Sequence, residues 1–147
     1  MAKICLEAEK ASSHEIDADF TGKTFSRIDQ SIAMGALFTA QHLGAKAIVA
    51  LTDSGSTALW MSRHDITIPI YALTPKLATQ RRMALYRNVS AMLMPHLSDR
   101  DAALAHAEQL LVTRGVLKPG DTYAITCGEP MGYPGGTNML KVARVGG

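Results

Sequence analysis

The residues best suited to chemistry in this sequence form a short turn between an apolar run and a helix-like segment. The turn reads TDSGST and consists of Thr52, Asp53, Ser54, Gly55, Ser56 and Thr57. Its hydroxyls and N–H groups would converge at the amino end of a helix, which attracts anions, and Gly55 would let a ligand approach the backbone. Serine and threonine are also favoured there as caps without any ligand. The local pattern therefore leaves two interpretations open, an anion site and a plain capped turn.

A second loop of interest, CGEPMGYPGGTN, contains four glycines and two prolines. Taken alone, it is a long turn before an edge strand. In an open α/β sheet, ligands bind beyond the carboxyl ends of the strands, where the strand order reverses. If the order is 3-2-1-4-5, this loop and the TDSGST turn line one crevice, which would favour the anion site.

Other kinds of site have weaker support. Gly22-Lys23-Thr24 matches the end of a phosphate-binding P-loop, but Asp17 stands where the leading glycine belongs and no strand precedes it. The sequence has no G-x-S-x-G or H-E-x-x-H motif, and its five histidines do not stand at metal-ligand spacing. Met61, Met83, Met92 and Met94 lie on segments with helix or strand periodicity. We expect these methionines to pack in the core.

Composition indicates one globular domain, since the chain has 147 residues of which 47% are hydrophobic. The net charge is only +2 and neither sign forms a block, so no nucleic-acid or membrane-surface partner is indicated. Cys5 and Cys127 are far apart and lack C-x-x-C spacing, as expected in a reducing cytoplasm. The first residues lack the apolar region of a secretory signal, and the stretch 30–45 is too short and polar to span a bilayer.

Hydrophobic periodicity predicts the elements that would position the two loops. Apolar residues recur every three or four positions over 25–43, which predicts an amphipathic helix ending at Gly44. The run KAIVAL predicts a strand buried on both faces, and hence a parallel sheet. Pro75 is expected at the first position of a helix, and Ser98 with Asp101 predicts a capping box.

The predicted strands are 46–51, 68–73, 89–94, 122–127 and 138–145, and the predicted helices are 25–43, 57–64, 75–86 and one from about 98 to Gly115. Strands that alternate with helices predict right-handed βαβ units in an α/β sheet with helices on both faces. The last strand is expected to be an antiparallel edge.

Several motifs in order resemble one known family. They are the A-I-V-x-L-T-x-S-G strand and turn, the P-I-x-A-L-T strand, the L-Y-R-x-V step, the K-x-G-D turn and a final G-T-N before the closing strand. Together they resemble the C-terminal domain of pyruvate kinase over about residues 20 to 145. Residues 1–20 resemble the helix and lead-in that connect that family's catalytic barrel to this domain, leaving 21–147 as the domain itself.

The resemblance implies a three-layer α/β fold with five strands in the order 3-2-1-4-5, the last antiparallel. It implies a parent enzyme that transfers phosphoryl from phosphoenolpyruvate to ADP with Mg²⁺ and, usually, K⁺. In that family the active site belongs to the barrel, so we expect no catalytic residue, metal or cofactor in this chain and no activity from it alone. An excised domain is expected, with a natural short gene as the alternative.

The resemblance also implies a site. Residues Thr52 to Thr57 match the family's effector phosphate loop, and the part that closes over the sugar corresponds to Gly132, Tyr133, Gly135, Gly136 and Thr137. Two departures from the family pattern argue against a bisphosphate ligand. Ser56 stands where many activated members have Lys or Arg, and Ala103 lies near the position of a second phosphate-binding arginine. Asp53 would also repel phosphate.

The expected ligand is therefore a sugar monophosphate or AMP held mainly by N–H groups and hydroxyls, or there is no effector at all. The family resemblance also implies a homo-oligomer, a dimer for this domain and a tetramer for the parent enzyme. Two alternatives are a purely structural oligomerisation domain and a free-standing phosphate- or nucleotide-binding protein on the same fold.

Overall fold

The computed structural model describes residues 26–146. The expectations for the connecting segment 1–20, for Cys5 and for Gly22-Lys23-Thr24 lie outside the described residues. The elements are α2 (Ile28–Leu43), β1 (Ala47–Leu51), α3 (Ser56–Ser62), β2 (Ile70–Thr74), α4 (Leu77–Met83), β3 (Val89–Leu93), α5 (Arg100–Thr113), β4 (Thr122–Gly128) and β5 (Thr137–Arg144).

The five strands form one sheet in the order β3-β2-β1-β4-β5, as predicted. The strands β3, β2, β1 and β4 are parallel, whereas β5 pairs antiparallel with β4. All five residues of β1 are buried, in keeping with the prediction of a strand covered on both faces. The sheet reverses its order between β1 and β4, so the carboxyl ends of these two strands are neighbours.

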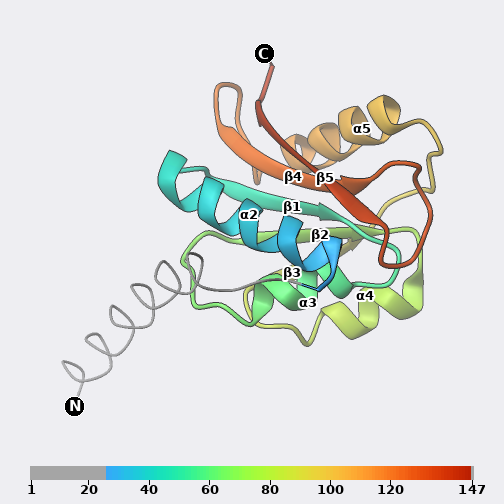
Figure 1. The fold of residues 1–147 in the computed structure, drawn as a ribbon. Helices are drawn as coiled ribbons and strands as arrows, with labels where there is room; N and C mark the ends of the chain where they lie inside the picture. The colour runs from blue at the N-terminus through green and yellow to red at the C-terminus, as the bar shows by residue number, and fades with distance from the viewer. Residues whose placement is uncertain (1–25, 147) are drawn as a thin grey trace.

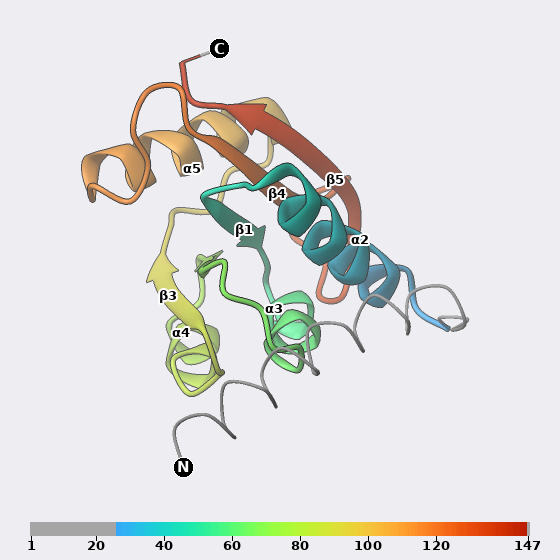
Figure 2. The same cartoon turned by 90° about the vertical axis from the view of Figure 1, so that its left-hand side faces the viewer.

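Helices α2, α3 and α4 cover one face of the sheet and α5 covers the other (Figures 1 and 2). The chain moves from β1 to β2 to β3 in one direction across the sheet and then returns to β4. Because crossover connections between parallel strands are right-handed, the helices of the outward steps and the helix of the return step lie on opposite faces. This arrangement is the expected three-layer α/β fold.

Alternate residues of the strands contribute to apolar clusters on the two faces of the sheet. On the α5 face, Val49 of β1 and Ile125 of β4 pack with Leu111. On the α2 face, Ile48 and Ile70 pack with Leu37. The four methionines expected in the core all pack there: Met61, Met83 and Met94 are buried, and Met92 is partly buried against the α5-face core.

Helix α2 ends as predicted, and the face that it buries overlaps the predicted one only in part. Gly44 adopts the left-handed conformation (φ 66°) and closes the helix, since glycine carries no penalty there. Ile28 and Leu43, which the apolar pattern assigned to the core, are 69% and 58% exposed. Ala36, Leu37 and Ala40 of the predicted pattern are buried, together with Ala33, Met34 and Asp29.

Two helix starts also differ from prediction. Helix α4 begins at Leu77, after Lys76, so Pro75 precedes the helix instead of occupying its first position. The Thr74 hydroxyl accepts a hydrogen bond from the N–H of Lys76, which keeps the chain in a turn for longer. Helix α5 is capped by Asp99, whose carboxylate accepts from the N–H of Ala102, so the expected capping box at Ser98 is wrong by one residue.

Candidate functional site

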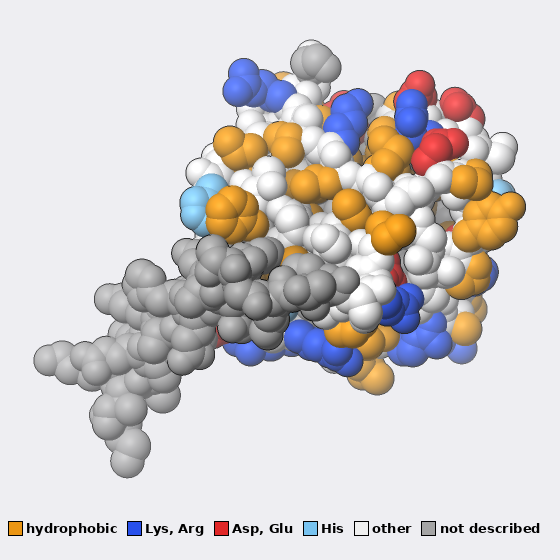
Figure 3. All heavy atoms as spheres, in the orientation of Figure 1, with side chains coloured by type: hydrophobic (Ala, Val, Ile, Leu, Met, Phe, Trp, Pro, Cys, Tyr) orange, Lys and Arg blue, Asp and Glu red, His pale blue; other side chains and the backbone are white. Residues whose placement is uncertain are grey.

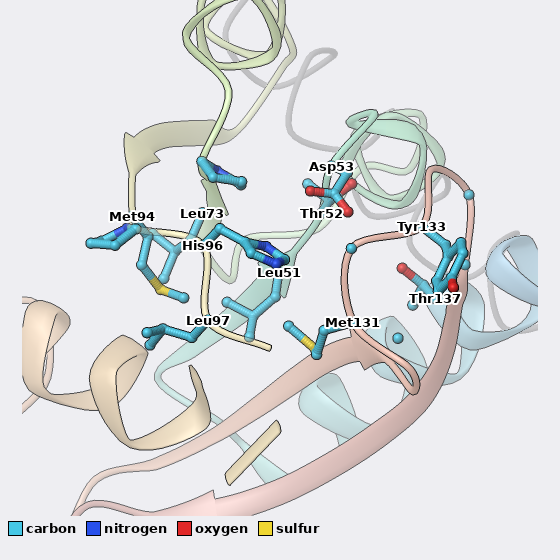
Figure 4. A pocket seen from close by; sticks show the side chains of 16 residues that line it. Leu51, Thr52, Asp53, Leu73, Met94, His96, Leu97, Met131, Tyr133 and Thr137 are labelled. Carbon is cyan, nitrogen blue, oxygen red and sulfur yellow. The ribbon is translucent and has the colours of Figure 1, made fainter. Parts of the chain in front are cut away.

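A crevice lies beyond the carboxyl ends of β1, β2 and β4, with a cavity volume of about 40 Å³ (Figure 4). The β1–α3 turn and the β4–β5 loop both border it, as the strand order predicts. Seven of the residues expected at the site line the crevice: Thr52, Asp53, Gly132, Tyr133, Gly135, Gly136 and Thr137. Ser54, Gly55, Ser56 and Thr57 are not among its lining residues.

The turn itself is tightly internally bonded. The N–H of Gly55 donates to the Thr52 hydroxyl at 2.9 Å, and the N–H of Ser56 donates to the Ser54 hydroxyl at 3.3 Å. Gly55 has a φ of 84°, and a side chain there would meet Met83 at 3.0 Å. Helix α3 is only seven residues long. Two of the N–H groups expected to hold a ligand, those of Gly55 and Ser56, are thus engaged by hydroxyls of the turn itself.

A pair of buried threonines joins the turn to the second loop. The Thr57 hydroxyl donates a hydrogen bond of 2.8 Å to the Thr137 hydroxyl, and both side chains are buried. Asn138 braces the same loop at its base, since its side chain accepts from the N–H of Glu129 and donates to the carbonyl of Glu129, both at 2.9 Å. The Thr57–Thr137 hydrogen bond therefore connects the β1–α3 turn to the β4–β5 loop.

A buried carboxylate that the sequence does not flag also contacts the turn. Asp29 of α2 is 1% exposed and accepts hydrogen bonds from Arg27, from the N–H of Gln30 and from the Ser56 hydroxyl, all at 2.9 Å. The Arg27 guanidinium also lies 3.0 Å from the position that a Cβ on Gly135 would take. The Arg27–Asp29 pair thus contacts both loops of the crevice.

Helix α4 supplies a second cation. The guanidinium of Arg82 donates to the Ser54 carbonyl at 2.6 Å, and the Thr79 hydroxyl donates to the Asp53 carbonyl at 2.8 Å. The turn has no Lys or Arg in its own sequence, but the fold brings Arg27 and Arg82 to it. In the sequence, Asp29 stands out only as a charged residue within the helix pattern. No local pattern in the sequence marks Arg82 as a residue of the site.

The remaining wall of the crevice is apolar. Leu73, Met94, Leu97 and Met131 line it, and the His96 ring packs against Gly132, with its Cε1 atom 3.1 Å from where a Cβ would stand. Tyr133, labelled in Figure 4, also lines the crevice and is 64% exposed. The mixture of apolar, hydroxyl and charged groups suits binding of a small polar molecule with an apolar part.

Catalytic or metal chemistry has no comparable support in this part of the chain. Among residues 26–146, no group of three or more His, Cys, Asp and Glu side chains could hold a metal ion. Cys127 is a buried free thiol whose pKa is raised chiefly by burial, which disfavours the reactive thiolate. None of the helices described is long and apolar enough to cross a membrane.

Comparison with known proteins identifies the family. The model of the family "Pyruvate kinase, alpha/beta domain" matches residues 30–143. A pyruvate kinase of Buchnera aphidicola subsp. Baizongia pistaciae is 37% identical over 146 residues, and pyruvate kinase II of Salmonella typhimurium is 36% identical over the same length. Each match covers 99% of this chain and 30% of the relative. A Geobacillus stearothermophilus pyruvate kinase is 35% identical over 143 residues, which is 24% of its length. The chain belongs to the pyruvate kinase alpha/beta domain family.

Proposed function

We propose that this domain binds a phosphorylated small molecule, a sugar monophosphate or AMP, in the crevice between the β1–α3 turn and the β4–β5 loop. In a longer pyruvate kinase, this binding would regulate the enzyme. The observation that carries the proposal is the meeting of these two loops at the β1/β4 switch point, joined by the Thr57–Thr137 hydrogen bond. Ligands of open α/β sheets bind where the strand order reverses.

The charges around the turn favour a single phosphate. Arg82 and Arg27 would supply the positive charge, and the hydroxyls of Ser54 and Ser56 would donate hydrogen bonds once released from their present partners. Asp29 and Asp53 would repel a second phosphate. The remainder of the ligand would face Met94, Leu97 and Met131. Because the cavity holds only about 40 Å³, the β4–β5 loop must move outward for a sugar or a base to enter.

The parent reaction would depend on other parts of the polypeptide. The relatives are about three times as long as the part this chain matches. We place the transfer of phosphoryl from phosphoenolpyruvate to ADP, with its Mg²⁺ and K⁺, in regions of the relatives that this chain does not match. We therefore expect no phosphoryl transfer by this chain alone. A cytoplasmic location fits the glycolytic role and the free thiol of Cys127.

Calorimetric titration tests the binding proposal. Glucose 6-phosphate, ribose 5-phosphate and AMP are compared with glucose, ribose and adenosine, which lack the phosphate. Arg82→Gln should weaken binding of the phosphorylated ligand three- to tenfold, whereas Arg81→Gln, an exposed neighbour on α4, should leave it unchanged. Binding that is equal with and without phosphate, or equally sensitive to both substitutions, would contradict the proposal.

A subunit interface is a second candidate function, favoured by an apolar surface over α2 and β5. Ile28, Phe38, Leu43 and Val142 are each at least 41% exposed, and Figure 3 shows apolar side chains gathered over these elements. Surfaces of this kind mark association sites more often than single exposed residues do. We infer that this surface, here named the α2–β5 surface, joins two copies of the domain.

Sedimentation measures this association directly. The wild-type chain should sediment as a dimer at micromolar concentration, and Leu43→Glu with Val142→Glu should yield monomers. Leu85→Glu is the matched control, because Leu85 is 87% exposed but lies just after α4, away from the α2–β5 surface. A monomeric wild-type chain, or a dimer unaffected by the two substitutions, would contradict the proposal of a subunit interface.

A further inference from the structure

A trough between α5 and β5 lies on the face of the sheet opposite α2. Its cavity volume is about 480 Å³, within the usual range for small-molecule sites. Asp101, Leu104, Ala105 and Glu108 form the helix wall, and Tyr123, Lys141 and Ala143 are among the strand residues. It shares no lining residue with the crevice described above.

The register of β5 explains why the trough is open and which side chains face it. Lys141 pairs with Ile125 and Ala143 pairs with Tyr123, and these β4 residues belong to the core under α5. Paired residues on adjacent strands share a face, so Lys141 and Ala143 face α5. Ala105 and Ala143 are small, which leaves the space between the helix and the edge strand unfilled.

A carboxylate is held in a fixed orientation in this trough. The Tyr123 side chain is 4% exposed, and its hydroxyl donates to Glu108 Oε1 at 2.7 Å. Burial, followed by the hydrogen bond to Glu108, raises the pKa of Tyr123, so the phenol remains a donor at neutral pH. Glu108 is only half-buried, and among the described residues only its Oε1 atom accepts a hydrogen bond.

The opposite charge lies nearby without a partner. Within the part of the chain that the structure describes, neither Glu108 nor Lys141 forms an ion pair. Lys141 is two residues from Ala143, the strand neighbour of Tyr123, which places it roughly 7 Å along the strand from the level of Glu108. The trough therefore presents Glu108 and Lys141 as a negative and a positive group. Asp101 also lines it but is paired with Arg100, and alternation along the strand directs the side chain of Arg144, which follows Ala143, to the other face of the sheet.

We propose that this trough binds a zwitterionic ligand, whose ammonium group pairs with Glu108 and whose carboxylate pairs with Lys141. Because the Lys141 backbone lies roughly 7 Å along the strand from the level of Glu108, the two charges of the ligand would be separated by a chain of several atoms. A free amino acid with a terminal ammonium and a peptide ending in lysine both carry this chemistry. This site is independent of the phosphate crevice and of the α2–β5 surface.

The test uses 6-aminohexanoate, which carries both charges on a flexible chain, followed by amide NMR signals of the full chain. Its uncharged-end analogues, n-hexylamine and hexanoate, are the controls. We expect saturable shifts at Ala105, Glu108 and Ala143 with millimolar affinity, and at least fivefold weaker binding of either analogue. Binding of n-hexylamine or hexanoate as tight as that of 6-aminohexanoate, or no saturable shift, would overturn the proposal.

Substitutions assign the two charges. Glu108→Gln and Lys141→Gln should each weaken binding of 6-aminohexanoate three- to tenfold. Lys118→Gln, an exposed lysine outside the trough, should leave it unchanged. Equal affinity in all three variants would overturn the assignment. Titration with L-lysine and with the tripeptide Gly-Gly-Lys distinguishes the two sources: binding of both indicates a free amino acid site, and binding of the tripeptide alone indicates a peptide terminus.

Discussion

The hydroxyl of Thr57, at the start of α3, donates a hydrogen bond of 2.8 Å to the hydroxyl of Thr137, which begins β5 80 positions later. Both side chains are buried, so neither hydroxyl has water as an alternative partner. The bond ties the β1–α3 turn to the β4–β5 loop. Movement of one border of the crevice is therefore coupled to the other.

The energetic coupling of these two threonines can be measured. Thr57→Val and Thr137→Val keep the shape but each leaves one buried hydroxyl without its partner, so each should lower the free energy of unfolding by about 1–2 kcal/mol. The double variant should lose less than the sum of the two. Urea unfolding gives all three values, with Thr113→Val on exposed α5 surface as a control expected within about 0.5 kcal/mol. Strictly additive losses would contradict the coupling.

Asp29 should be important for stability as well as for the site. Asp29→Asn removes the charge that Arg27, Ser56 and the N–H of Gln30 stabilise, so we expect a loss of about 2 kcal/mol in thermal or urea unfolding. The control is Asp101→Asn, because the Asp101 side chain is 78% exposed and its ion pair with Arg100 is a surface pair. Equal losses of unfolding free energy in the two variants would show that the buried hydrogen bonds of Asp29 stabilise the fold no more than a surface ion pair does.

Gly55 should tolerate a side chain less well than a glycine of similar conformation in open space. Gly55 and Gly120 have φ values of 84° and 90°, and both substitutions to alanine carry the left-handed penalty of about 1 kcal/mol. At Gly55 the new Cβ also meets Met83 at 3.0 Å, whereas at Gly120 nothing lies within 4 Å. We expect Gly55→Ala to cost at least about 1 kcal/mol more than Gly120→Ala in urea unfolding. Equal costs would mean that Met83 moves aside freely.

Tyr123 should make the protein lose stability in alkali. Its pKa is raised above the ordinary value of 10.0 by burial and by Glu108, so above that pH the unfolded chain releases a proton that the folded chain retains. Ionisation of Tyr123 should therefore leave the free energy of unfolding unchanged below pH 10. Above pH 10 it should lower that free energy by up to about 1.4 kcal/mol per pH unit. In Tyr123→Phe this decline should be shallower. Parallel curves for the two proteins between pH 9 and 11 would refute this interpretation.

The sequence predicts the sheet because its signals are local. Every residue of β1 is apolar, so the run predicts a strand buried on both faces. Gly44 marks the end of α2 because it can adopt the left-handed conformation. The start of α4 is not predicted, because the hydrogen bond from Lys76 N–H to Thr74 competes with the helix that Pro75 suggests. Helix α2 follows its apolar pattern only in part, because Ala36, Leu37 and Ala40 are buried whereas Ile28 and Leu43 are exposed.

The sequence predicts only part of the candidate site. The small and hydroxyl residues of the turn stand out as a group, and the strand order places the second loop beside them. Arg27, Asp29 and Arg82 come from α4 and from the beginning of α2, and only the tertiary fold brings them to the turn. The turn has no cation in its own sequence, but the guanidinium groups of Arg27 and Arg82 lie beside it.

Contact of one phosphorylated molecule with both loops of the crevice can be followed by amide NMR during a titration with glucose 6-phosphate. We expect the signals of Ser54 to Thr57 and of Gly132 to Thr137 to shift together with one dissociation constant, and glucose at equal concentration to shift neither group. Flat signals in both loops with glucose 6-phosphate, AMP and ribose 5-phosphate, or shifts confined to other parts of the domain, would contradict it.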